Sequence, residues 1–241
     1  MNARLETPVP DTLSADQAIG QIAVQLPGAT AVFRRLKLDF CCGGQVSLRE
    51  ATAGKGLDLQ AVLGELAQLH RPTELPAATA PGQLIDHILS RYHEVHRAQL
   101  PELVRMARRV EAVHRDHVDV SAGLADFLED MEQELLSHMA KEEQVLFPML
   151  KAGGNSFVTQ PIAMMRYEHV DHGASLEKLM HLTHDATPPM GACNTWRALY
   201  AGIAQLHDDL ISHIHLENNV LFPQFEAQQP QGCGSSGCVC S

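Results

Sequence analysis

Two segments of the chain carry the same pair of side chains that could bind a metal ion. Residues 134–148 read ELLSHMAKEEQVLFP and residues 209–223 read DLISHIHLENNVLFP, with eight of fifteen positions identical. Each segment contains H-x-x-x-E, His138 with Glu142 and His213 with Glu217. Residues four apart lie on one face of a helix, so each pair should point an imidazole and a carboxylate in one direction. An unpaired buried carboxylate is costly, and a bound metal removes that cost. The repeat therefore predicts a two-metal site.

A weaker repeat precedes each of these segments. RYHEVH (91–96) comes before the first and RYEHVDH (166–172) before the second, which aligns His93 with His169. The chain then reads as two helical hairpins, each with one lone histidine and one H-x-x-x-E pair. Together they give six donors, enough for two irons with bridging carboxylates: His93, His138, Glu142, His169, His213 and Glu217.

The donor types narrow the choice of metal. Imidazole with carboxylate fits iron, manganese or zinc better than calcium or magnesium. Structural zinc usually takes four ligands, often thiolates, and does not need six donors. Two metals bridged by Glu142 and Glu217, each with two histidines, best suit iron. Such a centre would keep coordination positions open for an exogenous ligand.

Several further polar residues lie close to these six in the sequence. His96, His172 and His215 are two or three positions from a proposed ligand and should point away from the metals. Glu134 lies one turn before His138, and Glu168 is next to His169. Both glutamates could orient imidazoles or line a polar path to the metals. The alternative for each is an ordinary exposed helical glutamate.

Four helices should position the six donors, which gives an all-α fold. Apolar residues at helical spacing predict helices over about 82–115, 121–150, 159–184 and 193–227. Short connections between them indicate an up-down four-helix bundle, whose interior commonly holds metal sites. Pro148 and Pro223 should end or bend a helix one to two turns beyond the site.

A small helical unit should precede the bundle. Ser14 with Gln17 resembles a capping box that opens a short helix to about residue 25, and Asp58 could cap a later helix. The segment RPTELPAATAP has the composition of a linker. We therefore divide the chain into a leader (1–11), a small helical domain (12–70), a linker (71–81), the bundle (82–228) and a cysteine-containing tail (229–241).

Composition excludes some classes of partner. The net charge of -11 argues against nucleic acid or an anionic membrane surface. We find neither a signal-peptide pattern nor an apolar run near the roughly 18 residues of a membrane span. We therefore expect a cytoplasmic protein, in which the six cysteines act as thiols or metal ligands and not as disulfides.

The sequence resembles a known family. The chain is similar to the repair-of-iron-centres family in five motifs: DFCCGG (39–44), RYH, SHMAKEEQVLFP, an EH dipeptide and HIHLENNVLFP. Its members are hemerythrin-like di-iron proteins with an ScdA-type N-terminal domain. The resemblance covers about residues 14–227 and implies iron ligands at the same six positions, with Glu142 and Glu217 as the bridging pair. It also matches Glu134 and Glu168 to carboxylates associated with a channel to the iron.

The resemblance implies repair or maintenance of iron–sulfur clusters damaged by nitrosative or oxidative stress. The protein would supply labile iron and react with nitric oxide, so its partners would be nitric oxide and damaged iron–sulfur proteins. A homodimer is a further candidate assembly. The alternative is a protein that binds, buffers or senses nitric oxide or dioxygen without donating iron. An enzyme that reduces nitric oxide or peroxide is less favoured, because no nucleotide-binding Gly loop is evident. A metal-free scaffold comes last.

The cysteines form three groups. Cys41 and Cys42 match the family's vicinal pair, and thiolates beside Gly43 could accept iron, carry a persulfide or react with nitric oxide. The alternative is two small buried residues at the end of a helix. Cys193 is expected to be structural. The tail departs from the family and is read as a redox-sensitive segment with three cysteines: Cys233, Cys238 and Cys240.

Overall fold

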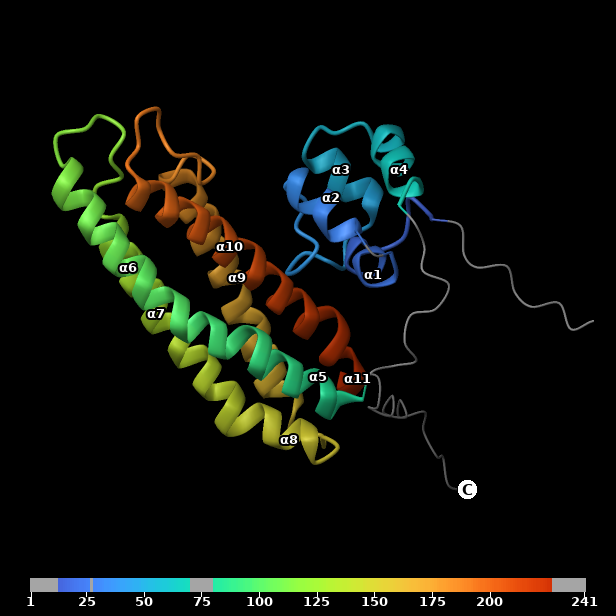
Figure 1. The fold of residues 1–241 in the computed structure, drawn as a ribbon. Coiled ribbons are helices and arrows are strands. Elements are labelled where there is room, and N and C mark those ends of the chain that lie inside the picture. Colours follow the sequence, from blue (N-terminus) through green and yellow to red (C-terminus); the bar gives the residue numbers. More distant parts are fainter. Residues whose placement is uncertain (1–12, 27, 70–79, 227–241) are drawn as a thin grey trace, which may run out of the picture.

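The fold is all-α, as predicted. The computed structural model describes residues 13–26, 28–69 and 80–226, and within these ranges the only strand-like pairing is an isolated bridge between Ala18 and Ser47. A small helical domain comes first, and a four-helix bundle follows it (Figure 1). The predicted leader, the tail and nearly all of the predicted linker lie outside the described residues.

Four antiparallel rods make the bundle, and three of them are built from more than one helical segment (Figure 1). Successive rods run in opposite directions, which confirms the up-down topology. The segments of the rods in chain order are α5 (Pro81–Ile88), η1 (Leu89–His93) and α6 (Glu94–His114); α7 (Leu124–Lys141), η2 (Glu142–Leu146) and α8 (Phe147–Lys151); α9 (Thr159–Leu182); and α10 (Asn194–Leu216), η3 (Glu217–Leu221) and α11 (Pro223–Glu226).

Three of the rods contain a π-helical turn, and each such turn begins or ends at a predicted ligand. In η3 the amide of Phe222 donates to the carbonyl of Glu217 at 2.9 Å, five residues back. Pro148 and Pro223 follow these turns, and the rods continue beyond both prolines; a bend at either proline stays a prediction. Each proline lies in the first turn of a new α-segment, where a backbone N–H would donate no hydrogen bond within that segment, so proline is tolerated.

Two apolar clusters fill the bundle, one on each side of a polar layer. Leu100, Leu135 and Ile203 belong to the larger cluster, toward the end with the long loops. Ile88 and Phe222 belong to the smaller cluster, toward the end with α8 and α11. Since the predicted ligands lie between the two clusters along every rod, apolar packing holds the polar layer from both sides.

The small domain has its own core and consists of α1 (Ile19–Gln25), α2 (Ala29–Arg35), α3 (Leu48–Gly54) and α4 (Leu59–Ala67). Asp58 caps α4 by accepting from the amide of Gln60, as predicted. The expected capping box at Ser14 and Gln17 is wrong. Those residues form a turn, because the chain that follows pairs with the segment around Ser47. The capping box in this domain joins Ser47 and Glu50 at the start of α3.

The small domain lies against α10 and η3 (Figure 1). The Asn219 side chain donates to the carbonyls of Phe40 and Cys41, and the Phe40 ring lies 5.1 Å from the ring of His215. A Cβ atom at Gly20 would lie 2.6 Å from the side-chain oxygen of Asn219, so the contact needs a glycine there. Asn219 therefore joins the small domain to the bundle.

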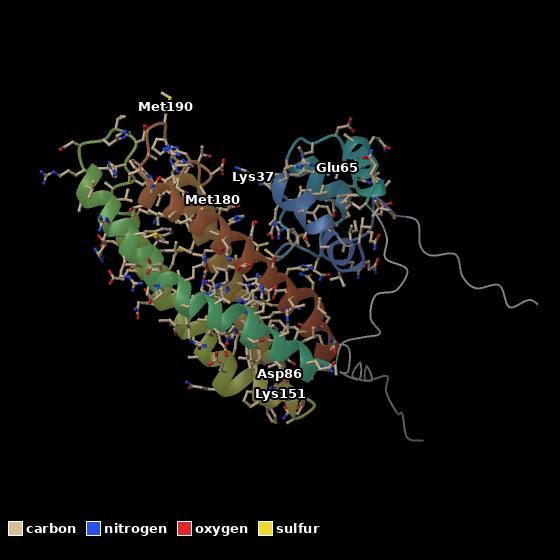
Figure 2. All side chains as sticks on the ribbon, viewed as in Figure 1. Lys37, Glu65, Asp86, Lys151, Met180 and Met190 are labelled. Carbon is tan, nitrogen blue, oxygen red and sulfur yellow. The ribbon has the colours of Figure 1, made fainter. Side chains whose placement is uncertain are left out.

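Ion pairs lie at both ends of the molecule. Lys151 reaches Asp86 at 2.6 Å near the end formed by α5 and α8 (Figure 2). Lys37 of the small domain lies 2.9 Å from Asp185, in the loop after α9. All four side chains are largely exposed, so these pairs add little to the free energy of unfolding. Among the described helices, none combines the length and apolarity needed to cross a membrane.

Candidate metal centre

Six buried side chains meet in the polar layer between the two apolar clusters. All four rods contribute, and each of the six is at most 1% exposed. These are the six residues expected from the repeats: His93, His138, Glu142, His169, His213 and Glu217. Their nitrogen and carboxylate oxygen atoms form two groups of four that share the two glutamates, and within each group the atoms lie within 4.8 Å of one another.

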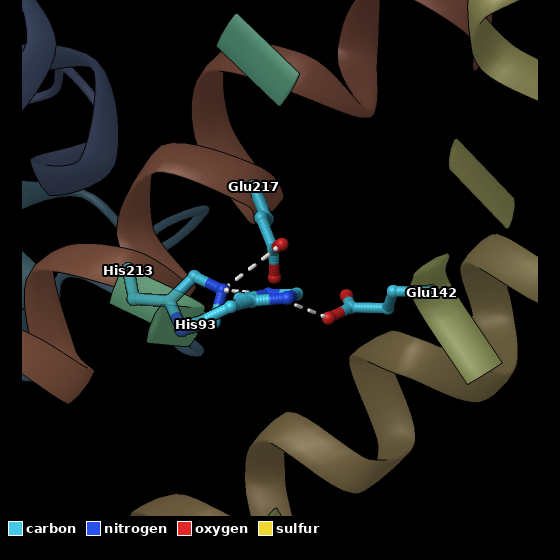
Figure 3. Close-up of side chains that lie close together, drawn as sticks. All are labelled: His93, Glu142, His213 and Glu217. Carbon is cyan, nitrogen blue, oxygen red and sulfur yellow. Dashed lines mark hydrogen bonds and ion pairs between the residues drawn. The ribbon is translucent and has the colours of Figure 1, made fainter. Parts of the chain in front are cut away.

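The first donor group consists of His93, His213 and the two glutamates (Figure 3). His93 Nε2 lies 3.3 Å from His213 Nε2 and 3.3 Å from Glu142 Oε2. His213 Nε2 lies 3.1 Å from Glu217 Oε1. Figure 3 shows that both carboxylates point toward the two imidazoles from different helices.

The second donor group consists of His138, His169 and the same two glutamates. The Nε2 atoms of His138 and His169 are 3.1 Å apart. Glu142 Oε1 lies 3.5 Å from His138 Nε2, and Glu217 Oε2 lies 3.1 Å from His169 Nε2. Each carboxylate therefore turns one oxygen toward each donor group.

These distances fit metal coordination. With bonds of about 2.0–2.2 Å to nitrogen and oxygen, neighbouring ligands of one ion are roughly 2.8–3.6 Å apart. Among the described residues, no hydrogen-bond partner is found for either oxygen of Glu142 or for Glu217 Oε2. A bound cation would stabilise buried carboxylate oxygens that face imidazole nitrogens and have no hydrogen-bond partner. The site is therefore able to hold a metal ion.

The two lone histidines are oriented from outside by equivalent residues of the repeat. His93 Nδ1 lies 2.7 Å from Glu143 Oε1, and His169 Nδ1 lies 2.9 Å from Asn218 Oδ1. Donation through Nδ1 leaves the Nε2 lone pair free for a metal. Neither Glu143 nor Asn218 was predicted from the sequence. The available signal was their aligned position, directly after the two shared glutamates.

The histidines of the two H-x-x-x-E pairs have unlike surroundings. His138 Nδ1 lies 2.8 Å from Glu168 Oε2, and Lys141 also donates to the Glu168 carboxylate. His213 Nδ1 has no hydrogen-bond partner within the described ranges, and its ring stacks on Tyr92 at 5.2 Å. Glu168 and Tyr92 are equivalent in the repeat, because each precedes a lone histidine. The second donor group thus has the more polar surroundings.

Burial sets the protonation of these groups. It lowers the pKa of His138 to about 2, with the neighbouring His169 acting in the same direction. Burial and the charge of Glu217 raise the pKa of Glu142 well above its ordinary value. Burial opposes ionisation at Glu217 as well, but His213 and His169 outweigh it and lower the pKa of Glu217. Neutral imidazoles at neutral pH are the form that binds metals.

The neighbouring candidates lie outside both donor groups. Glu134 is exposed and lines a surface groove between α7 and α9. His96, His172 and His215 are buried, and none of them is a member of either group. His215 points to the small domain and contacts Asn219 at 3.0 Å. A role for Glu134 in a channel stays a prediction.

The vicinal cysteines lie in the loop between α2 and α3, against the bundle. Since α2 already ends at Arg35, they do not terminate a helix. Cys42 Sγ donates to the carbonyl of His169 at 3.3 Å, and Asn218 donates to the carbonyl of Cys41 at 3.1 Å. The hydrogen bond between the two thiols lowers the pKa of Cys42 and raises that of Cys41. This loop therefore contacts the second donor group.

The remaining cysteines are far from the centre in sequence. Cys193 lies at the N-cap position of α10, near the start of the helix as expected, and its Sγ lies 3.2 Å from Nε2 of His114. The three tail cysteines fall outside the described residues.

Comparison with known families decides the identity of the bundle. Residues 84–225 match the family model described as Hemerythrin HHE cation binding domain. The chain belongs to the hemerythrin family. A second model, described as Domain of Unknown function (DUF542), matches residues 15–70, which contain the vicinal cysteines. The family expected for the bundle from the sequence is thus confirmed.

This hemerythrin-family chain also has close full-length relatives. It is 51% identical to the iron-sulfur cluster repair protein YtfE of Citrobacter koseri, over 87% of this chain and 96% of the relative. Proteins of the same name in Enterobacter sp. strain 638 and in Escherichia coli K12 are 50% and 49% identical over the same shares. The similarity therefore extends over both the bundle and the small domain.

Proposed function

We propose that the bundle holds two iron ions, one at each donor group, with Glu142 and Glu217 bridging them. One observation carries the proposal: each carboxylate directs its Oε1 and Oε2 atoms to different pairs of imidazoles. A single ion would not use all four oxygens and all four imidazoles in this way. Iron suits the donor set, since it accepts both imidazole and carboxylate.

We further propose that the protein repairs iron–sulfur clusters damaged by nitrosative or oxidative stress. The names of its relatives support this role. Two irons with open coordination positions would supply redox chemistry and a binding place for nitric oxide. Damaged iron–sulfur proteins would be the partners, and iron would be delivered to them as cargo.

The residues around the iron would control retention and release. Glu143, Asn218 and Glu168 fix the rings of three histidines through Nδ1. Such outer contacts are typically worth 10–100-fold in metal affinity, an effect on the order of 1.4–2.7 kcal/mol. Two of them, Asn218 and Glu168, serve the second donor group, where the small domain makes contact. Movement of that domain would therefore affect one iron more than the other.

The test is recovery of a damaged cluster enzyme. Iron-loaded protein is mixed with a cluster-dependent dehydratase that nitric oxide has inactivated, and the dehydratase activity is followed. We expect recovery with the wild type and with Gln133→Ala, an exposed position on α7, and none with His138→Ala. Equal recovery with His138→Ala would refute repair by this centre.

A second candidate is binding of nitric oxide or dioxygen without iron donation. It is favoured by the complete burial of the donor side chains, which suits a small gas better than a departing metal ion. Iron bound to the protein before and after cluster recovery separates the two. A donor loses iron in proportion to the clusters restored, whereas a gas-binding protein keeps both ions.

A further inference from the structure

A second cluster of potential metal ligands lies outside the bundle. Asp39, Cys41 and Cys42 offer a carboxylate oxygen and two sulfurs that all lie within 4.8 Å of one another. Cys41 Sγ is 3.7 Å from Cys42 Sγ and 3.3 Å from Asp39 Oδ1. Both thiols are free of disulfides. The cluster therefore places two soft sulfur donors beside one hard oxygen donor.

The geometry of this cluster fits one tetrahedral ion. Two thiolates bound at about 2.3 Å to one tetrahedral metal are about 3.8 Å apart, close to the 3.7 Å between these sulfurs. The backbone amides of Cys42 and Gly43 each donate to the Asp39 carboxylate at 2.9 Å and hold it beside the thiols. A Cβ atom at Gly43 would lie 2.9 Å from Asp39 Oδ2, so a larger residue would disturb this arrangement.

The cluster is attached to one side of the bundle centre. Cys42 Sγ donates to the backbone carbonyl of His169. Asn218 accepts from Nδ1 of His169 and donates to the carbonyl of Cys41. His169 belongs to the second donor group only. The loop that carries Cys41 and Cys42 (residues 39–44, the thiol loop) therefore contacts a ligand of only one of the two proposed iron positions.

We propose that Asp39, Cys41 and Cys42 form a transfer site for a thiophilic divalent cation, and that it receives Fe²⁺ from the His138–His169 side of the centre. This inference rests on the proposed function. Three protein ligands leave one coordination position open, as in sites that exchange a ligand and unlike closed structural sites. Transfer breaks the iron's bonds to imidazole and carboxylate in the bundle, and it forms two iron–sulfur bonds and one bond to an Asp39 carboxylate oxygen. The two thiol protons pass to solvent, and no atom changes its oxidation state.

Cobalt titration of the iron-loaded protein tests the site. The parent is the full chain with the tail changed by Cys233→Ser, Cys238→Ser and Cys240→Ser, so that tail thiols do not contribute. Co²⁺ is added while thiolate-to-cobalt charge-transfer absorption and protein-bound iron are both measured. We expect one further cobalt per chain with thiolate absorption, while the bundle keeps its iron.

Three variants in this parent background locate the signal. Cys42→Ser should abolish the thiolate absorption, and Asp39→Asn should weaken cobalt binding on the order of tenfold or more. Cys193→Ser, a thiol at the far end of α10, should change nothing. Asp39 is exposed, so its variant should fold even if Cys42→Ser does not.

The outcomes separate this inference from the function on which it rests. A parent that keeps its iron but shows no thiolate absorption overturns the transfer site and leaves the di-iron proposal standing. Unchanged cobalt binding in both Cys42→Ser and Asp39→Asn also overturns it. A parent that binds no iron in the bundle overturns the di-iron proposal, and the transfer site with it.

Discussion

The Nδ1 atom of His169 lies 2.9 Å from the side-chain oxygen of Asn218. The amide nitrogen of the same asparagine donates to the backbone of Cys41 in the small domain. One buried side chain therefore orients a proposed ligand and holds the thiol loop in place. Under the di-iron proposal, the position of the small domain would affect the retention of iron at the second donor group.

Replacing Asn218 should weaken both contacts at once. In Asn218→Ala the His169 ring loses its acceptor, and we expect iron affinity at the second donor group to fall about 10–100-fold. Amide hydrogen exchange at residues 39–44 should become faster, because the loop loses a hydrogen bond to the bundle. Iron retention against a chelator and exchange rates measure the two effects, with Gln133→Ala as the control. Iron loss without faster exchange would contradict the coupling.

Glu168 and Glu134 give a matched pair of carboxylates. Glu168 accepts from His138 and from Lys141, whereas Glu134 is exposed. We expect Glu168→Ala to reduce equilibrium iron affinity about 10–100-fold, and Glu168→Gln to reduce it less because an acceptor oxygen remains. Glu134→Ala should leave the affinity unchanged, and any channel role would appear only in the rate of iron uptake. Equal affinity losses in both alanine variants would contradict this distinction.

The metal-free protein should lose stability as the pH falls below about 6.5. Burial lowers the pKa of four histidines, to about 2 for His138, about 3 for His96 and about 4 for His172 and His215. Below pH 6.5 these rings take up protons in the unfolded chain but not in the folded one, so each reduces the free energy of unfolding by up to about 1.4 kcal/mol per pH unit.

Glu142 acts in the opposite direction over part of this range. Its raised pKa means that the folded state binds a proton which the unfolded state releases, so this carboxyl favours folding as the pH falls. Four histidines outnumber it, and the net effect between pH 6.5 and 5 should be on the order of a few kcal/mol. Urea unfolding of metal-free protein at pH 7.5, 6 and 5 measures it. A free energy of unfolding that stays constant would contradict the expected sign.

Removing the buried carboxylate of Glu142 should stabilise the metal-free protein while it abolishes iron binding. Both oxygens of Glu142 lack a hydrogen-bond partner among the described residues, whereas Glu217 Oε1 contacts His213 at 3.1 Å. We expect Glu142→Leu to raise the free energy of unfolding by on the order of 1–3 kcal/mol. Glu217→Leu should gain less, because it also removes a hydrogen bond. A large loss of stability in metal-free Glu142→Leu would refute the idea that its carboxylate is kept for the metal.

The helix periodicity predicted the fold, and the repeat predicted the six side chains that the structure brings together. Residues four apart on a helix must share a face, so His138 with Glu142 and His213 with Glu217 followed from spacing alone. The π turns were not predicted from the sequence, because one extra residue in a turn leaves the apolar pattern almost unchanged. The roles of Asn218 and Tyr92 were also missed, since they depend on which side of each imidazole faces the neighbouring rod.

The most direct test of the di-iron proposal is the iron bound per chain in the wild type, in His93→Ala and in Glu142→Gln, measured together with the magnetic coupling of the iron. Two irons that share both glutamates should give two coupled ions in the wild type. His93→Ala removes a ligand of one position only and should keep about one iron, whereas Glu142→Gln weakens both positions and should keep less. A wild type with a single uncoupled iron, or a Glu142→Gln variant that still binds two, would contradict the shared-carboxylate centre.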